Sequence, residues 1–322
     1  MPAAAKRLLA EPIIYPHMDG RMGDNITGPS LIRVPDWVER RLGRYYLYFA
    51  DHKGKYIRLA YADELLGPWT MYEPGALDLS QSLYPAEDPP EPPEELRPPW
   101  AKKMVGGYLY AHIASPDVHI DAETRQFRMY FHGLLPNGDQ ATRVAYSSNG
   151  LAFVPKQPLL GSPYFRVFSY EGWHYTLTWG GNIWRSREWD APFEKGPQIL
   201  PYADKEGVGD GVRHSETFLR GDILHIFYHR MGDCPEAVLH AEMKLAGDWE
   251  NWTASPPTVL LEPELTWEGA DLPLEPSVMG AVDRRVRQLR DPAIFEDVDG
   301  SLYMLYCGAG ESGIGITSLE LT

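Results

Sequence analysis

Three acidic residues stand at comparable places in the sequence, each at the start of an apolar segment. The segments are Ser115-Pro116-Asp117-Val118, His214-Ser215-Glu216-Thr217 and Arg290-Asp291-Pro292-Ala293. A desolvated carboxylic acid near other carboxylates has a raised pKa and can donate a proton at neutral pH, whereas an ionised carboxylate can accept one. The pattern predicts acid–base chemistry, with Glu216 as the acid and Asp117, Asp291 or Asp24 as its partner.

Arginine, histidine and aromatic side chains accompany these acids. An arginine either neutralises an acid or binds an anionic group bidentately, and a large aromatic ring offers an apolar stacking surface. Neutral imidazole is also a common metal ligand. No pair of these histidines has helical ligand spacing, so we expect no metal site and no required cofactor. The predicted binding residues are Arg166, Tyr164, Trp179, His214, Arg213, Arg290, His132, His229 and His52.

A repeat of short strands, which recurs five times, must position these residues. Each unit opens with a turn and an apolar strand, continues with an aromatic-rich strand and a third strand, and in four units adds a fourth strand carrying a large aromatic residue. Repeated four-stranded antiparallel units are typical of β-propellers. The sequence therefore predicts an all-β, five-bladed β-propeller around a central funnel. A two-sheet sandwich leaves the recurring fourth strand unexplained. The expected second strands are Tyr45–Ala50, Phe127–Gly133, His174–Trp179, Ile223–Arg230 and Ser301–Gly308.

The repeat also predicts the domain organisation. We expect one propeller domain over 1–322, with blades at about 24–80, 112–160, 162–201, 212–262 and 288–322 and with insertions at about 81–108 and 262–287. The first insertion contains Pro85–Pro99, whose proline and acidic content favours an extended surface segment. The fifth unit lacks a fourth strand. Pro12-Ile13-Ile14 is expected to dock where blades five and one meet.

Blade topology places the predicted chemistry at the propeller axis. The start of the first strand and the loop between the second and third strands lie on the same face of an antiparallel blade. The residues at five starts and five loops are therefore expected to line one pocket. They are Asp24, Thr27, Ser115, Asp117, Tyr164, Arg166, Arg213, His214, Glu216, Arg290, Asp291, Asp51, His52, His132, Trp179, Asn182, His229, Arg230 and Glu311.

The net charge and composition of the chain restrict the classes of molecule it is expected to bind. Thirty Lys and Arg against 45 Asp and Glu give a formal net charge of −15, which disfavours binding to nucleic acid or to an anionic membrane surface. The N-terminal residues resemble neither a secretory signal nor a membrane anchor. We therefore expect a cytoplasmic location, although a removed signal is left open. Cys234 and Cys307 match no zinc spacing and are expected to be buried free thiols.

Several segments together resemble glycoside hydrolase family 43 and its five-bladed relatives. The opening Arg290-Asp291-Pro292-Ala293-Ile294-Phe295, followed by Asp299–Tyr306, is similar to the blade signature of that group. The turns Ala62–Trp69 and Tyr146–Phe153 are similar to its turn between the third and fourth strands. The resemblance covers nearly the whole chain as architecture.

The resemblance implies an inverting glycosidase with an acid Glu in blade four, a base Asp in blade one and a supporting Asp in blade three. Glu216 matches the acid by blade and strand position. Blade one instead has Thr27-Gly28-Pro29-Ser30, and blade three has Tyr164 and Arg166. Relatives sometimes hold a hydrated calcium ion on the axis, and this structural calcium is left open.

The function expected from these residues is a glycoside hydrolase that cleaves a terminal sugar from an oligosaccharide or glycoside in the axial pocket. Trp179 and Tyr164 would stack on sugar rings, and two carboxyl groups would act as acid and base. Two alternatives remain. One is a propeller phosphorylase, in which the arginines near Glu216 hold phosphate. The other is a non-catalytic carbohydrate-binding propeller.

Overall fold

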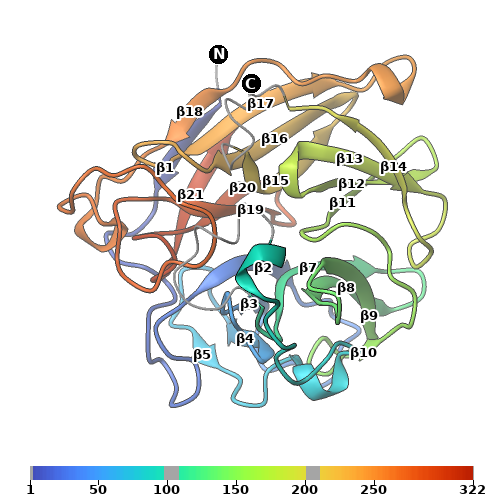
Figure 1. Cartoon of the computed structure of the whole chain (residues 1–322), viewed down its shortest axis with the longest axis horizontal. Helices are drawn as coiled ribbons and strands as arrows, with labels where there is room; N and C mark the ends of the chain where they lie inside the picture. Colours follow the sequence, from blue (N-terminus) through green and yellow to red (C-terminus); the bar gives the residue numbers. More distant parts are fainter. Residues whose placement is uncertain (1–2, 98–108, 201–210, 322) are drawn as a thin grey trace.

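Five small antiparallel sheets form a ring (Figure 1). The structure is a computed structural model of the chain, and it describes residues 3–97, 109–200 and 211–321. Each sheet is one blade, and the first strand of each blade lies closest to the axis. Helical structure in these residues consists of short 3-10 turns. The predicted five-bladed β-propeller is confirmed.

The strands follow one another along the chain within each blade. Blade one is β2 (Thr27–Arg33), β3 (Tyr45–Ala50), β4 (Tyr56–Ala62), β5 (Thr70–Met71) and β6 (Leu77–Asp78); blade two is β7 (Ile113–Asp121), β8 (Gln126–Leu134), β9 (Gln140–Ser147) and β10 (Val154–Pro155); blade three is β11 (Arg166–Tyr170), β12 (Trp173–Thr178), β13 (Asn182–Ser186) and β14 (Glu194–Gln198); blade four is β15 (Val212–Arg220), β16 (Ile223–Arg230), β17 (Val238–Lys244) and β18 (Thr258–Leu261); blade five is β19 (Arg290–Glu296), β20 (Leu302–Cys307) and β21 (Ile314–Glu320), with β1 (Ala4–Arg7) at its outer edge.

The outer edge of blade five corrects one prediction. The blade has a fourth strand, which the N-terminal segment supplies as β1 paired antiparallel with β21. Arg7 on β1 reaches the buried Glu268, with its Nε 2.7 Å from Oε1. Ile14 forms a bridge with Ile314, in agreement with the expected docking of Pro12-Ile13-Ile14 at this blade. The two ends of the chain therefore close the ring together.

Aromatic side chains from the second strands fill the space between blades. Tyr46, Tyr48, Phe127, Phe227 and Tyr306 are at most 1% exposed. Because alternate residues of a strand point to opposite faces, each such strand packs against both neighbouring blades. This packing fixes the inner strands around the axis.

Four of the five inner strands have a β-bulge where they approach the axis. The register shifts between Thr27 and Ser30 in β2, between Ala114 and Asp117 in β7, between Val212 and Ser215 in β15, and between Arg290 and Ala293 in β19. Three bulges contain a residue with positive φ: Gly28 at 60°, Ser115 at 51° and Asp291 at 49°. A bulge bends the strand and turns a side chain away from its regular direction, so these bulges direct side chains to the axis.

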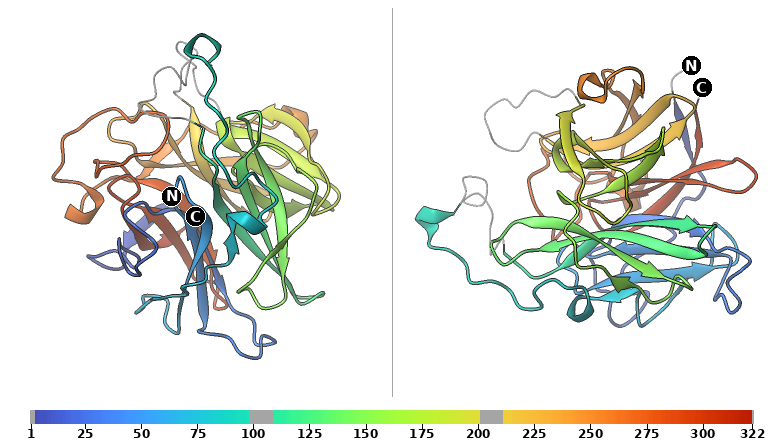
Figure 2. Two further views of the ribbon diagram at one scale, coloured as in Figure 1. Left: turned by 60° about the horizontal axis from the view of Figure 1, so that its bottom comes forward. Right: turned by 90° about the vertical axis from the view of Figure 1, so that its right-hand side faces the viewer.

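Within the first insertion, residues 85–97 are mostly exposed and contain one regular element, the 3-10 turn Glu94–Leu96. Figure 2 shows this segment extending away from the sheets. That agrees with the expectation for Pro85–Pro99, of which Pro98 and Pro99 lie outside the described residues.

Both cysteines are free thiols. Only Cys307 is buried, and Cys234 is exposed because it lies in the loop after β16, so the expectation of burial was wrong for Cys234. In the described ranges, no helix has the length and apolar character needed to cross a membrane.

Candidate functional site

A cavity of about 560 Å³ opens at the propeller axis. It is bounded by blade openings and by loops between second and third strands, as blade topology predicts. Two methionines and several small residues complete its wall. The lining residues are Thr27, His52, Tyr110, Leu135, Gly138, Asp139, Gln140, Gly161, Ser162, Pro163, Tyr164, Trp179, Trp184, Arg213, His214, Met231, Met279, Gly280, Asp291 and Glu311.

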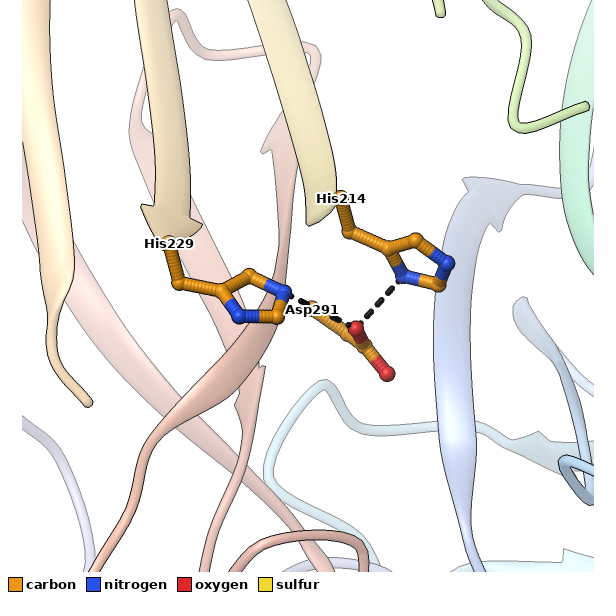
Figure 3. A group of neighbouring side chains, drawn as sticks. All are labelled: His214, His229 and Asp291. Atoms are coloured by element: carbon orange, nitrogen blue, oxygen red, sulfur yellow. Dashed lines mark hydrogen bonds and ion pairs between the residues drawn. The ribbon is translucent and has the colours of Figure 1, made fainter. Parts of the chain in front are cut away.

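Asp291 is the most heavily bonded carboxylate of this cavity. Its Oδ2 accepts hydrogen bonds from the Thr27 hydroxyl and from the backbone N–H of Gly28 at 3.0 Å. Its Oδ1 lies 2.5 Å from His214 Nδ1 and 3.2 Å from His229 Nε2 (Figure 3). Burial opposes ionisation of Asp291, but the two imidazoles hold its pKa well below the usual value. Asp291 is therefore an ionised carboxylate whose position is fixed from every side.

A buried ionic network lies behind Asp291. Glu236 has no exposed side-chain area, and its carboxylate accepts from Arg290 Nε at 3.0 Å and contacts His229 Nδ1 at 2.5 Å. Although burial disfavours its charged form, Arg290 and Arg213 lower the pKa of Glu236 to about 2. Arg213 lines the cavity, and its guanidinium also donates to the carbonyls of Gly280 and Val278 in the second insertion.

Glu311 connects the axial cavity with a second one. Its Oε1 accepts from Arg290 at 2.7 Å and lies 3.3 Å from His52 Nδ1, while its Oε2 accepts from Asn25 at 2.6 Å. Despite burial, His52 and Arg290 lower the pKa of Glu311. His52 and Glu311 line both the axial cavity and a neighbouring cavity of about 870 Å³ between the N-terminal segment and the second insertion.

Tyr164 forms the centre of a ring cluster beside the cavity. Its ring centroid lies 4.4 Å from that of His132 and 4.1 Å from that of His214. Burial raises the pKa of Tyr164, so its hydroxyl keeps its proton. Burial, together with the neighbouring His112, lowers the pKa of His132, so this imidazole is neutral. The cluster offers neutral hydrogen-bonding groups rather than charges.

Glu216 and Asp117 lie in a separate polar cluster between blades two, three and four. Glu216 Oε2 is 3.4 Å from Arg166 Nε, and Asp117 Oδ2 contacts His119 Nε2 at 2.9 Å. Burial, reinforced by the charge of Asp117, raises the pKa of Glu216 to about 7, whereas His119 holds the pKa of Asp117 below its usual value against the effect of burial. Neither carboxylate lines the axial cavity, so the acid role of Glu216 and the partner role of Asp117 stay predictions.

The remaining predicted residues are divided between the cavity and its surroundings. Trp179 stands at the cavity wall with 39% of its surface exposed. Asp24 is paired with His17 at 2.7 Å on the surface and lines the second cavity instead. His132 lines a small adjoining space, and His229 is fully buried behind Asp291. Of the predicted set, the axial cavity brings together His52, Tyr164, Trp179, Arg213, His214 and Asp291.

Sequence reasoning missed Glu236, His112 and Tyr110. Glu236 follows Cys234-Pro235 in the loop between β16 and β17, a loop class that was expected to reach the axis. That position was the available signal for Glu236. His112 and Tyr110 directly precede β7, and no motif singled them out. His112 Nδ1 bonds to the Tyr110 carbonyl at 2.7 Å.

Two groups of described residues have ligand atoms close enough to hold a metal ion. His214, His229 and Asp291 are buried at the axis, and Figure 3 shows the two imidazoles approaching the same carboxylate. The second group, on the faces of β16 and β17, consists of His225, His240 and Glu242.

Comparison with known proteins finds one viral relative that matches most of the chain. No family model matches the sequence. An uncharacterized protein of Acanthamoeba polyphaga mimivirus is 38% identical over 308 residues, which cover 90% of this chain and 82% of the viral protein. The chain belongs to the family of this viral protein. This relationship assigns no activity to the chain, because the viral relative is itself uncharacterized.

Solved structures relate the fold of this chain to that of glycoside hydrolase family 43 enzymes. A family 43 enzyme from Xanthomonas citri gives a TM-score of 0.59 at 11% identity, covering 97% of this chain and 92% of that enzyme. A family 43 β-xylosidase/α-arabinofuranosidase from a compost metagenome, in complex with xylotriose, gives 0.58 at 13% identity over 99% and 96% of the two chains. An exo-1,5-α-L-arabinanase from a bovine ruminal library gives 0.56 at 14% identity over 92% and 94%. The predicted resemblance to family 43 propellers is confirmed for the fold.

Proposed function

We propose that this protein is a glycoside hydrolase that cleaves a terminal sugar residue in the axial cavity. The observation that carries the proposal is the cavity itself. It combines the exposed indole of Trp179 in its wall with the polar pair of His214 and Asp291. Sugars present apolar C–H faces and hydroxyl groups, which an aromatic ring and fixed polar groups bind respectively.

The fold supports this proposal without deciding it. The similar structures include the family 43 enzyme from Xanthomonas citri in complex with xylotriose and with xylose. Fold similarity at these identities is compatible with many chemistries, so the argument rests on the site. In that site, His214 and Asp291 are the polar groups proposed to face the scissile bond. The acid role assigned to Glu216 from its strand position stays a prediction.

A phosphorylase is less well supported, because the arginines near the axis already face carboxylates of the chain. Arg213 donates to two backbone carbonyls and faces Glu236, Arg290 is held by Glu236, Glu311 and Gln288, and Arg166 bonds to backbone carbonyls beside Glu216. A phosphate ion needs guanidinium groups that are available to it. Hydrolysis is therefore proposed over phosphorolysis.

The test is product analysis after incubation with short xylo- and arabino-oligosaccharides, in buffers with and without phosphate. We expect release of a free terminal sugar in both buffers and a loss of activity of about 100-fold or more in Asp291→Asn, since loss of one preorganised polar group costs about that much. Trp173→Ala, on blade three and outside the cavity wall, is the control. Binding without turnover would replace the proposal by a carbohydrate-binding role, and a sugar phosphate product would replace it by phosphorolysis.

A further inference from the structure

The three groups of Figure 3 converge on one point at the axis. His214 Nδ1 and His229 Nε2 lie 2.5 and 3.2 Å from the same oxygen, Asp291 Oδ1, and all the ligand atoms lie within 4.8 Å of one another. For metal–ligand bonds of about 2.0–2.2 Å, neighbouring ligand atoms of a tetrahedral site are about 3.3 Å apart. The contact of His229 with Asp291 matches this spacing, whereas His214 Nδ1 lies closer to Asp291 Oδ1 than a tetrahedral site requires.

The contact between His214 and Asp291 is not an ordinary hydrogen bond. The two atoms are 2.5 Å apart, yet His214 Nδ1 is buried and makes no hydrogen bond to any described residue. The carboxylate oxygen therefore lies off the direction in which a ring N–H would point. Such an offset is compatible with both atoms facing a third atom. An unpartnered buried nitrogen next to a carboxylate is costly unless a cation completes the arrangement.

Each of the three side chains is held from its other end. His214 Nε2 contacts Ser115 Oγ at 3.2 Å, and His229 Nδ1 contacts Glu236 Oε1 at 2.5 Å. Asp291 Oδ2 accepts from Thr27 and Gly28. Hydrogen bonds of this kind orient metal-binding imidazoles and fix their tautomers. His229 Nε2 is itself within hydrogen-bonding distance of Asp291 Oδ1 at 3.2 Å, so a metal ion at this point would take the place of the proton that this contact shares.

A serine nucleophile is a weaker explanation of the same contacts. Ser115, His214 and Asp291 are connected in the order of a catalytic triad, but Ser115 is only 2% exposed. A triad also needs the His214 Nδ1–H to donate to Asp291, and the geometry of that contact does not provide this bond.

We propose that His214, His229 and Asp291 bind one divalent first-row transition-metal ion of the zinc class at the propeller axis. Two nitrogen ligands and one carboxylate oxygen suit zinc or iron(II), whereas calcium and magnesium take oxygen ligands. Because His214 and Asp291 also line the cavity, the remaining coordination positions face the space where a small molecule would bind. The metal site goes beyond the proposed glycosidase and does not rest on it.

The second histidine group provides an internal comparison. His225 Nδ1 lies 3.1 Å from His240 Nε2 and 3.6 Å from Glu242 Oε1. The Glu242 side chain is 49% exposed, and its carboxylate accepts no hydrogen bond from the described residues. This group lacks the surrounding support of the axial group, so it is expected to bind metal weakly.

The test measures metal binding directly. Protein stripped with a chelator is titrated with ZnCl₂, bound zinc is counted by mass spectrometry after desalting, and CoCl₂ is added separately to record its visible absorption. We expect one tightly bound ion per chain and a tetrahedral Co²⁺ spectrum. Asp291→Asn and His214→Ala should each weaken binding by 100-fold or more, and Ser115→Ala by about 10–100-fold. His174→Ala and the double variant His225→Ala/His240→Ala should bind as the unchanged protein does, and excess CaCl₂ should not displace zinc.

Three results would overturn the proposal. The wild-type protein could bind no zinc, zinc binding could be lost only in the His225→Ala/His240→Ala double variant, or CaCl₂ could displace the bound zinc. Circular dichroism shows whether each variant is folded. If His214→Ala fails to fold, Ser115→Ala still tests the proposal, because it is the mildest of the changes. Glycoside hydrolysis is assayed separately, so failure of the metal site and failure of the proposed function are distinguishable.

Discussion

Arg290 and Glu236 form an ion pair in which neither side chain has any exposed area. The Arg290 Nε lies 3.0 Å from Glu236 Oε2. The same guanidinium also binds Glu311 at 2.7 Å and Gln288 at 2.6 Å. Two buried carboxylates on different loops therefore share Arg290 as a charge partner, with Arg213 as a second partner of Glu236 and His52 as a second partner of Glu311.

Arg290→Met should consequently destabilise the fold by about 3–5 kcal/mol, because removing one partner of a buried ion pair leaves an uncompensated buried charge. Urea unfolding at neutral pH measures the change. The matched control is Arg41→Met, whose partner Asp36 is 98% exposed, and which should change stability by no more than about 1 kcal/mol. Equal effects of the two variants would contradict the role given to Arg290.

Trp179→Ala should weaken sugar binding about tenfold, since a stacked aromatic ring contributes on the order of 1 kcal/mol or more. The effect is expected in KM, with kcat little changed, because stacking is made equally in the ground state and the transition state. Isothermal titration with the best oligosaccharide substrate measures the affinity, and Trp173→Ala serves as the control. An unchanged affinity in Trp179→Ala would remove this ring from the binding site.

The sequence predicts the blades well because their strands are local patterns. β3 and β16 begin and end at the expected residues, since aromatic alternation between glycine-containing turns marks them. The fourth strands of blades one and two are only two residues long. β1 has no pattern of its own and forms because β21 offers an unpaired edge. A pairing between segments so far apart in the sequence cannot be predicted from the residues of either segment alone.

The site was predicted less completely, and a backbone irregularity explains much of the difference. Blade topology placed both His214 and Glu216 at the axis. The bulge between Val212 and Ser215 changes the register, and of the two only His214 lines the cavity. Bulges depend on the pairing of two strands, so they are not visible in one segment. Blade topology still identified Asp291, Arg213 and Tyr164, because those residues follow from strand order.

Removal of residues 1–8 should open blade five, because β1 covers the edge of β21 and carries Arg7 to the buried Glu268. We expect the melting temperature to fall by about 5 °C or more. The exposed strand edge should also promote self-association, which gel filtration detects. Arg7→Ala separates the two contributions, since it removes the ion pair and keeps the strand. A truncated protein with unchanged melting temperature and size would show that β1 does not close the ring.

The cluster of Glu216 makes the stability of the protein depend on pH in a defined direction. Burial and the nearby Asp117 raise the pKa of Glu216 from 4.5 to about 7. A group whose pKa is higher in the folded state favours folding while it is protonated. The stabilisation is complete below pH 4.5 and is lost as the pH rises through about 7. Arg166 reduces this loss because it attracts the ionised form.

Glu216→Gln should remove this dependence, because glutamine has nearly the same shape and does not ionise. At pH 4.5 the variant should be about as stable as the unchanged protein, and at pH 7.5 it should be more stable by about 1–3 kcal/mol, the order of magnitude that the shift implies. Urea unfolding at both pH values measures the difference, in which the titration of other groups largely cancels. Glu123→Gln, in an exposed turn, is the control and should show the same stability difference from the unchanged protein at both pH values. A Glu216→Gln variant that is less stable at pH 7.5 would show that the ionised carboxylate, held by Arg166, is the form the fold prefers.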